Sequence, residues 1–220
     1  MSKRRSDGER KRALILETAL ALFREKGFDA TTLRDIAGRA EISVGSAYHY
    51  FPSKEAIVFA YYEAQQDEHE KRARVKLHDA TGLRERLGIV FQSKIDAVRK
   101  DRELLVAIAR RLVDANDPLS AFSSESRDVR ERAIALFAEA VSVPEVSEDQ
   151  RDLVARALWA LHLALLAYLV NDRSRGARKT RELTEGVLDL VTPLVPMAGV
   201  GMLAPMVDRL RDVLTRADLL

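Results

Sequence analysis

Residues 31–59 read TTLRDIAGRAEISVGSAYHYFPSKEAIVF and contain two short helix patterns joined by three residues. The side chain of Thr31 or Thr32 can cap the first helix, and Ser43 can cap the second, which runs over 44–50. Two helices of this length, joined in this way, are typical of a helix-turn-helix, whose second helix enters the DNA major groove. The spacing alone fits ordinary packing of a capped helix pair equally well, so the residue types must decide.

The residues on the surface of this helix pair favour DNA binding. Gly45 and Ser46 present almost no side chain, which costs helix propensity but allows close approach to base edges. The aromatic run 48–50 offers ring faces for thymine methyl groups and hydroxyl or imidazole donors for phosphates. Lys54 lies in the first turn of the next helix, where a cation opposes the helix dipole. This placement becomes favourable if a phosphate docks on Lys54 and the free amides of that turn.

Helical periodicity continues on both sides of this pair. A helix with one apolar face ends before Gly27, and Ser53 caps a long helix that reaches about His78. Further breaks leave six more helices, and they fall at Gly82, Asp101, 116–118, 143–144, 173–176 and 193–201. No two-residue alternation is sustained anywhere, so the sequence predicts an all-α protein.

The composition indicates a globular protein whose basic surface is local. The chain has 220 residues, of which 47% are hydrophobic and 32% charged, and it has no cysteine. A disulfide scaffold and a thiolate metal site are therefore excluded. The formal charge of +2 divides into +3 over residues 1–55 and −1 over 56–220. Much of the excess lies in the first 12 residues, which we expect to form a flexible basic arm.

The apolar segments are too short to predict a membrane span. The longest nearly uncharged run, residues 157–170, has 14 residues, whereas a transmembrane helix needs about 20. The N-terminal apolar residues are spaced helically and interrupted by charges, unlike a secretory signal. We therefore expect a cytoplasmic protein with no membrane span.

Residues 31–59, together with the preceding Gly27-Phe28, closely resemble the DNA-binding signature of the TetR family of bacterial transcriptional regulators. The resemblance covers about residues 9–60, and the rest of the chain matches only in its helical layout. It implies phosphate contacts from Thr32, Leu33, Tyr48, Tyr50 and Lys54. It implies base contacts from Arg34, Val44, Gly45, Ser46 and His49, and Ser43 completes the candidate interface as the helix cap.

Two positions depart from the family pattern. Family members often have glycine where Glu41 stands, so Glu41 must accept the turn geometry at some cost. They also often have a larger aliphatic residue where Ala47 stands, which weakens packing beneath the recognition helix. Neither departure removes the site.

The resemblance implies a division of the chain into two domains. Residues 1–52 would form the helix-turn-helix domain with its basic arm, and 53–220 a helical domain that binds a signal and dimerises. We therefore expect a ligand-responsive repressor that binds a pseudo-palindromic operator in double-stranded DNA as a homodimer and is released by a small-molecule effector. The alternatives are a helical protein-interaction module, a regulator whose signal is a protein partner, and an activator.

The most apolar helix is expected over Ser147–Asn171, where Ser147 and Gln150 have the spacing of a capping box. Because it is apolar nearly all round, several of its faces must be covered. In the family, this helix and the next long one, 177–194, pair with their mates as a four-helix bundle. The candidate interface residues are Leu158, Leu161, Leu165, Leu169, Leu183, Val187 and Leu190. The alternative is a monomeric core in which a helix over 197–219 covers the remaining face.

The family encloses its ligand in the larger domain, so polar or aromatic residues on the apolar helices are candidate contacts. They are Gln92, Asp96, Arg110, Trp159, His162 and Tyr168. Simpler interpretations exist: His162 is typical of a hydrogen-bonded core histidine, and Arg110 and Arg111 of surface ion pairs with Asp114.

The sequence lacks the common signals for catalysis and for metal binding. It contains no cysteine nucleophile, no glycine-rich phosphate loop and no GxSxG motif. His49, His69, His78 and His162 lack the spacing and the accompanying glutamate of a helical zinc site, and His69-Glu70 is expected on a solvated face. We therefore expect no enzymatic activity, no metal and no cofactor.

Overall fold

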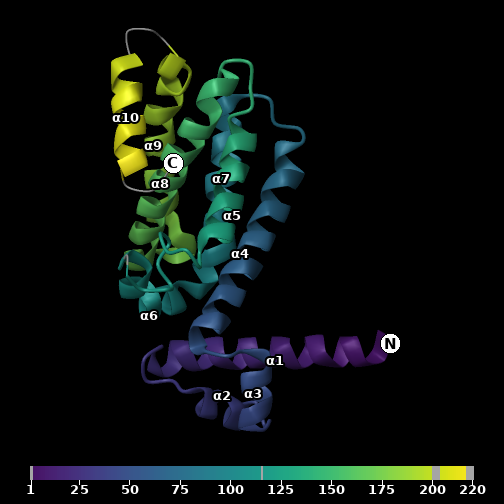
Figure 1. Ribbon diagram of the computed structural model, residues 1–220. Helices are drawn as coiled ribbons and strands as arrows, with labels where there is room; N and C mark the ends of the chain where they lie inside the picture. Colours follow the sequence, from purple (N-terminus) through teal and green to yellow (C-terminus); the bar gives the residue numbers. More distant parts are fainter. Residues whose placement is uncertain (1, 115, 200–203, 217–220) are drawn as a thin grey trace. The chain divides into compact units, whose positions relative to one another are not determined.

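The computed structural model describes residues 2–114, 116–199 and 204–216, and every regular element within them is a helix (Figure 1). The α-helices are α1 (Ser2–Lys26), α2 (Leu33–Arg39), α3 (Val44–Tyr50), α4 (Lys54–Leu77), α5 (Leu83–Val98), α6 (Arg102–Val113), α7 (Arg127–Ala140), α8 (Glu148–Asn171), α9 (Arg178–Val191) and α10 (Ala204–Arg216). Short 3₁₀ helices lie at Arg99–Asp101, Arg175–Ala177, Thr192–Leu194 and Pro196–Gly199. The predicted all-α class is confirmed.

The first helix, α1, begins at Ser2, so the prediction of a flexible basic arm is wrong. Lysine, arginine and glutamate have favourable helix propensity, and Asp7 forms an ion pair with Arg10 at helical spacing. These local interactions extend the amphipathic helix back to its basic start. Arg10, Lys11 and Arg12 are therefore exposed on a helix.

The chain forms two compact units. The first contains Met1–Ala64 and Asp101–Arg127, and the second contains Gln65–Lys100 and Asp128–Leu220. The division falls within α4, and α6 belongs to the unit that contains the helix-turn-helix. This differs from a boundary at residue 52, because polar contacts hold the start of α6 to the N-terminal helices: Asp101 accepts from Arg24 at 2.5 Å and from Tyr61 at 3.2 Å.

In the first unit, α1, α2 and α3 pack around a small apolar core (Figure 1). The rings of Phe23 and Phe28 lie 5.0 Å apart, centroid to centroid, and both are buried. Ile36 on α2 and Ala47 on α3 are fully buried. This core fixes the two short helices against each other and leaves their opposite faces to solvent.

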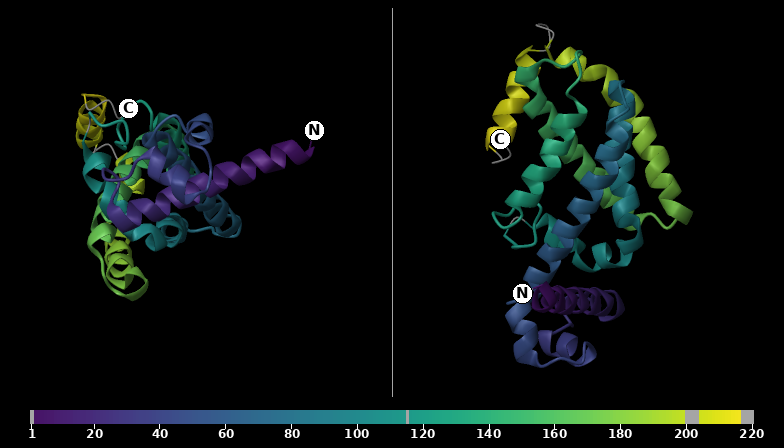
Figure 2. Two further views of the ribbon diagram at one scale, coloured as in Figure 1. Left: turned by 90° about the horizontal axis from the view of Figure 1, so that it is seen from below. Right: turned by 90° about the vertical axis from the view of Figure 1, so that its right-hand side faces the viewer.

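In the second unit, α9 packs along α5 and α8 (Figure 2). The buried rings of Phe91 and Phe137 lie 5.1 Å apart, and α8 adds buried residues that include Leu158 and Leu165. Among the described residues, α8 alone has the length and hydropathy of a membrane-spanning helix. A core helix meets the same criteria, and the buried face of α8 accounts for its apolar composition.

The start of α8 shows one further correction. Ser147 is the N-cap as predicted, but its side chain makes no cap hydrogen bond, so the predicted capping box with Gln150 is wrong. The Gln150 amide donates instead to the backbone carbonyl of Ser147 at 3.1 Å. Because Ser147 is exposed, water can satisfy the first amides of this helix.

Candidate nucleic-acid interface

The start of α2 is fixed by the capping box that the sequence predicted. The Asp35 amide donates to Thr32 Oγ1 at 3.1 Å, and the Thr32 amide donates to Asp35 Oδ2 at 2.8 Å. The Thr32 hydroxyl also donates to Asp35 Oδ2 at 2.7 Å, and this bond, followed by those from the Thr32 amide and Lys26, lowers the pKa of the Asp35 carboxyl to about 2. The carboxylate is therefore charged at neutral pH, and the first turn of α2 is held in one geometry.

The turn between α2 and α3 depends on one unfavourable backbone angle. Glu41 has a φ of 54°, in the left-handed region that glycine prefers, as the comparison with the family pattern led us to expect. The Ile42 amide donates to the carbonyl of Ala37 at 3.0 Å, which closes the turn. Glu41 thus accepts local strain so that α3 can begin immediately.

The recognition helix α3 has one buried and one exposed face. Ser43 is its N-cap and accepts from the Ser46 amide at 3.1 Å. Ala47 is completely buried beneath the helix. On the opposite face Val44 is 37% exposed and Tyr48 54% exposed. This is the arrangement of a helix held against its domain by a small residue while larger side chains point outward.

The remaining predicted DNA contacts differ in how accessible they are. The exposed residues are Thr32, Arg34, Ser43, Gly45 and His49, and Ser46 and Tyr50 are half-buried. Leu33 is buried in the core of the first unit, so the implied phosphate contact would have to come from its backbone amide at the start of α2 and stays a prediction. An added Cβ at Gly45 would meet no atom within 4 Å, so the space above this residue is open to a base edge.

Lys54 has partners inside its own unit, which the sequence did not reveal. Its ammonium donates to the carbonyl of Phe28 at 2.7 Å and to that of Asp29 at 3.4 Å, and it lies 4.5 Å from the Phe28 ring centroid. Burial lowers the pKa of this lysine. The carbonyls that follow α1 therefore stabilise a cation at the start of α4 without a phosphate, and the phosphate contact of Lys54 stays a prediction.

Ion pairs distinguish the basic residues of this surface: some are paired with carboxylates and one is not. Arg39 bonds Glu25 through both terminal nitrogens, at 2.6 and 2.8 Å, and Lys26 lies 3.1 Å from Asp35. In the part of the chain that the structure describes, Arg34 forms no ion pair and is exposed. It is thus the guanidinium of α2 that is free to contact DNA.

Sequence reasoning missed the basic residues of α1 as part of a folded surface. A Cβ added at Gly8 would lie 3.8 Å from the Tyr50 hydroxyl, so the early turns of α1 run beside the end of α3. The guanidinium of Arg12 lies 4.9 Å from the Phe51 ring centroid, at the C-cap of α3. The signal was present as the basic cluster itself, but it was interpreted as an unstructured arm.

The predicted ligand contacts do not form one site. Arg181 on α9 donates to Gln92 Oε1 at 2.8 Å and to Asp96 Oδ1 at 2.6 Å, so these two residues of α5 join helices. Tyr168 is 42% exposed, whereas Trp159 and His162 are buried. Arg110 is exposed on α6 in the first unit, and its neighbour Arg111 pairs with Asp29 and Asp117 instead of Asp114.

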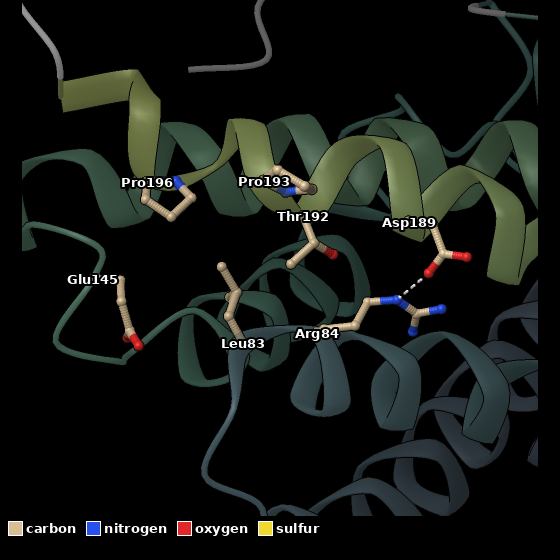
Figure 3. A pocket seen from close by; sticks show the side chains of 7 residues that line it. All are labelled: Leu83, Arg84, Glu145, Asp189, Thr192, Pro193 and Pro196. Atoms are coloured by element: carbon tan, nitrogen blue, oxygen red, sulfur yellow. Dashed lines mark hydrogen bonds and ion pairs between the residues drawn. The ribbon is translucent and has the colours of Figure 1, made fainter.

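The second unit has an open pocket of about 350 Å³ (Figure 3). It is lined by Leu83, Arg84, Glu145, Asp189, Thr192, Pro193 and Pro196, and contains none of the predicted ligand contacts. Arg84 bonds Asp189 at 2.8 Å in this lining, so its guanidinium is already paired. Within the described residues, no group of three or more acidic or histidine side chains is arranged to hold a metal ion.

Most of the leucines of α8 that were predicted to form a dimer interface point into the core of the second unit. Leu158, Leu165 and Leu169 are buried within the chain's own core and Leu161 is half-buried, so this band does not meet a partner. The opposite band is made of small residues: Ala164 and Ala167 are exposed, and Ala157 and Ala160 are half-buried. In these two bands the large side chains point into the core and the small ones outward. Burying a large apolar side chain in the core stabilises the fold, whereas exposing it to water does not.

The predicted interface residues of α9 are accessible. Leu183 and Leu190 are exposed, Val187 is half-buried, and Leu194 continues the same helical stripe. The alternative of a covering helix over 197–219 falls partly outside the described residues. Its described part, α10, leaves Tyr168 on α8 42% exposed and Leu190 on α9 74% exposed.

A capped helix pair with a half-exposed second helix, an open glycine and an unpaired arginine defines a helix-turn-helix DNA-binding protein. A family model described as "Bacterial regulatory proteins, tetR family" matches residues 15–61. A second model, "Tetracyclin repressor-like, C-terminal domain", matches residues 86–211. The chain therefore belongs to the TetR family and is a DNA-binding transcriptional regulator, not an enzyme.

Individual relatives agree with this assignment. The chain is 31% identical over 166 residues to the HTH-type transcriptional repressor KstR of Mycolicibacterium smegmatis, covering 74% of this chain and 79% of KstR. The TetR transcriptional regulator of Nitrosomonas europaea has the same fold, with a TM-score of 0.64 at 19% identity over 82% of this chain and 97% of that chain. FadR of Bacillus subtilis, in complex with stearoyl-CoA, gives a TM-score of 0.63 at 16% identity over 80% and 96%.

Proposed function

We propose that this protein is a ligand-responsive repressor that binds a pseudo-palindromic operator as a homodimer and is released by a small-molecule effector. The observation that carries the proposal is the exposed face of α3, where Val44, Gly45 and Tyr48 lie open, together with Arg34 of α2, which is exposed and forms no ion pair among the described residues. The relative KstR is named a transcriptional repressor, and the structural neighbour FadR holds stearoyl-CoA. Such a regulator acts on DNA in the cytoplasm.

The proposed DNA contacts divide by chemistry. Arg34 can donate two hydrogen bonds to guanine, and the edge Val44 to Ser46 can approach thymine methyl groups because it has little side chain. The hydroxyl of Tyr48 and the imidazole of His49 supply donors for phosphates or bases. Arg10 to Arg12 on α1 add positive charge beside α3, which strengthens binding to any DNA sequence and makes it salt-dependent.

A dimer is proposed because one helix-turn-helix contacts too few base pairs for a tight site. Two copies related by a two-fold axis read two half-sites, and such an interface uses the same surface on both copies. The supporting surfaces are the alanine band of α8 (Ala157, Ala160, Ala164, Ala167) and the apolar stripe of α9 and the 3₁₀ helix after it (Leu183, Val187, Leu190, Leu194). Small residues let helices approach closely, and exposed leucines supply apolar area to bury.

Release by an effector follows from a population shift. An effector that binds one arrangement of the dimer better than another weakens operator affinity by the difference in its two binding free energies.

The test is a gel-shift and footprinting titration, at stated salt, against the DNA that flanks the protein's own reading frame. Random DNA serves as competitor. We expect binding that survives the competitor and protects a pseudo-palindrome. Arg34→Ala should relax the preference at one base position per half-site and weaken binding by roughly 1–3 kcal/mol. Arg173→Ala, at an exposed arginine of the second unit, is the matched control and should bind like the wild type.

Loss of binding to both DNAs at moderate salt would leave only nonspecific electrostatics. That result, or an Arg34→Ala variant with unchanged sequence preference, would contradict the proposed interface and favour a helical protein-interaction module.

A further inference from the structure

The second unit contains a group of buried polar side chains that its fold does not require. The group, called here the buried polar cluster, comprises Gln66, His69 and Glu70 on α4, Lys94 on α5 and His162 on α8. Each is at most 9% exposed. His69-Glu70 is therefore buried, and the expectation of a solvated face is wrong. Apolar residues at these positions would stabilise a helical core more, because burying a polar group costs free energy unless it is hydrogen-bonded. The polar groups therefore need another explanation.

Lys94 is a buried ammonium with too few acceptors. It has three N–H donors, and its described hydrogen bond is to Gln66 Oε1 at a long 3.4 Å. The carboxylate of Glu70 is occupied by other donors: Arg74 at 2.9 Å, Arg132 at 2.9 Å and Gln66 at 3.2 Å. Among the described residues, therefore, no anion neutralises the positive charge of Lys94 by direct contact.

His162 has no hydrogen-bond partner for either ring nitrogen. It is 4% exposed and packs against the rings of Phe91 and Phe137, with centroids 6.2 and 5.7 Å away. A neutral imidazole has one donor and one acceptor, and both are unused here. The interpretation as an ordinary hydrogen-bonded core histidine therefore does not hold for the described residues.

His69 is half satisfied in the same way. Its Nε2–H donates to the carbonyl of Val90 at 2.9 Å, while its Nδ1 is buried without a partner. Its ring stacks with that of His162 at 6.3 Å between centroids, and burial and the charge of Lys94 lower the pKa of both. Buried polar groups in folded proteins nearly always have partners, so three incompletely satisfied neighbours indicate a missing one.

The chemistry of these groups selects the class of ligand. Lys94 attracts an anion and repels a cation, and the N–H of a neutral imidazole can donate to the same anion. Phe91 and Phe137 beside His162 are suited to the apolar body of such a molecule. Inorganic anions lack that body, and metal cations would meet a lysine in place of a free carboxylate.

We propose that the buried polar cluster recognises the acid group of an organic acid effector, with Lys94 and His162 as its principal contacts. The proposal rests on the proposed function in taking the protein to be effector-controlled. Because the cluster is closed to solvent, a ligand can enter only when α4, α5 and α8 separate. The acid-bound arrangement therefore differs from this one, as release of DNA by an effector requires.

The experiment measures binding to the full chain without DNA, by calorimetry and by thermal shift. The probes are butanoate, hexanoate, octanoate and phenylacetate, each paired with the alcohol of the same carbon skeleton. We expect saturable binding of at least one carboxylate and much weaker binding of its alcohol. Lys94→Met should remain folded and bind that carboxylate roughly tenfold or more weakly, since it loses a charge-assisted hydrogen bond. Lys71→Met, at an exposed lysine of α4, should bind like the wild type.

Several outcomes would overturn the proposal. The first is that none of the four carboxylates binds saturably. The second is that an acid and its alcohol bind with equal affinity. The third is that Lys94→Met binds the carboxylate as tightly as the wild type. His162→Phe gives a second check, because an aromatic ring fits between Phe91 and Phe137 while the imidazole contact is lost. Acid binding that leaves operator affinity unchanged would support the site but contradict effector control, so the two proposals fail separately.

Discussion

Replacing Lys94 with methionine should make the protein more stable at pH 7. Lys94 is buried, and its ammonium has a single described acceptor at 3.4 Å. Burial, partly offset by the nearby Glu70 carboxylate, lowers the pKa of Lys94 from 10.5 to about 8. A lowering of this size means that folding with the lysine charged lowers the free energy of unfolding by about 3 kcal/mol. Methionine has a similar length without the charge.

The substitution also has a cost, so the net gain is smaller. Gln66 Oε1 loses its donor, and a buried acceptor left without a partner costs at least about 1 kcal/mol. The expected free energy of unfolding of Lys94→Met is therefore about 2 kcal/mol above that of the wild type at pH 7. Buried charges replaced by apolar residues of similar volume often show gains of this order.

The gain should depend on pH in a defined direction. The pKa of Lys94 is lower in the folded protein than in the unfolded chain, so the unfolded chain binds more protons between about pH 8 and 10.5. Wild-type stability from this group is lowest below pH 8 and recovers as the pH rises through that window. His69 and His162 are neutral there because burial lowers the pKa of each. The advantage of Lys94→Met should shrink accordingly.

Urea unfolding followed by circular dichroism, at pH 7 and at pH 10, measures both effects. Lys71→Met is the matched control and should stay within about 0.5 kcal/mol of the wild type at either pH. A Lys94→Met variant less stable than the wild type at pH 7 would show that the lysine supports the fold. An advantage of equal size at both pH values would show that its charge is not the cause. Either result would refute the reasoning.

Three further predictions concern the first unit and the interface. Thr32→Ala should lower the free energy of unfolding by about 1 kcal/mol in urea titrations, because the N-cap of α2 is lost. The wild type should also lose the stability of this capping box as the pH falls from about 4 towards 2, the pKa of Asp35, and Thr32→Ala should show a smaller step, because the amide of residue 32 and Lys26 still bond the carboxylate. Glu41→Gly should raise stability by up to about 1 kcal/mol, since the relief of a left-handed backbone outweighs the added chain entropy; a clear loss of stability would contradict the strain. Leu190→Glu should convert a dimer to monomers in light scattering, whereas Val75→Glu, at a valine of similar exposure, should not; a persistent dimer would place the interface elsewhere.

The first unit was predictable because its signals are local. Thr32 with Asp35, Ser43 before α3 and Gly27 after α1 each act within a few residues, and the structure places the helix ends where these residues indicate. The exposed face of α3 followed from the same pattern. The contacts of Lys54 could not be predicted in this way, because its acceptors, the carbonyls of Phe28 and Asp29, lie 26 and 25 residues away in the sequence.

The second unit was harder to predict because its helices are apolar on more than one side. In α8 the leucine band and the alanine band are both compatible with a core, and only packing decides that Leu158 and Leu165 face inward while Ala164 faces outward. The same limit applied to polar residues. Gln92 and Asp96 drew attention as polar residues on an apolar helix, but Arg181, 89 and 85 residues further on, satisfies both.

Several positions where this sequence departs from stability rules lie at the two proposed sites, although Ala177, with a φ of 58°, does not. Glu41 takes a left-handed backbone and Gly45 weakens a seven-residue helix, and both lie at the proposed DNA surface. Lys94 and His162 leave polar groups unsatisfied in a core that could be apolar. Natural sequences tolerate such conflicts mainly where function requires them. If Gly45→Ala and Lys94→Met both stabilise the fold while the first weakens operator binding and the second weakens acid binding, the conflicts are functional. If both destabilise it, these residues are parts of the scaffold, and the coincidence carries no information about function.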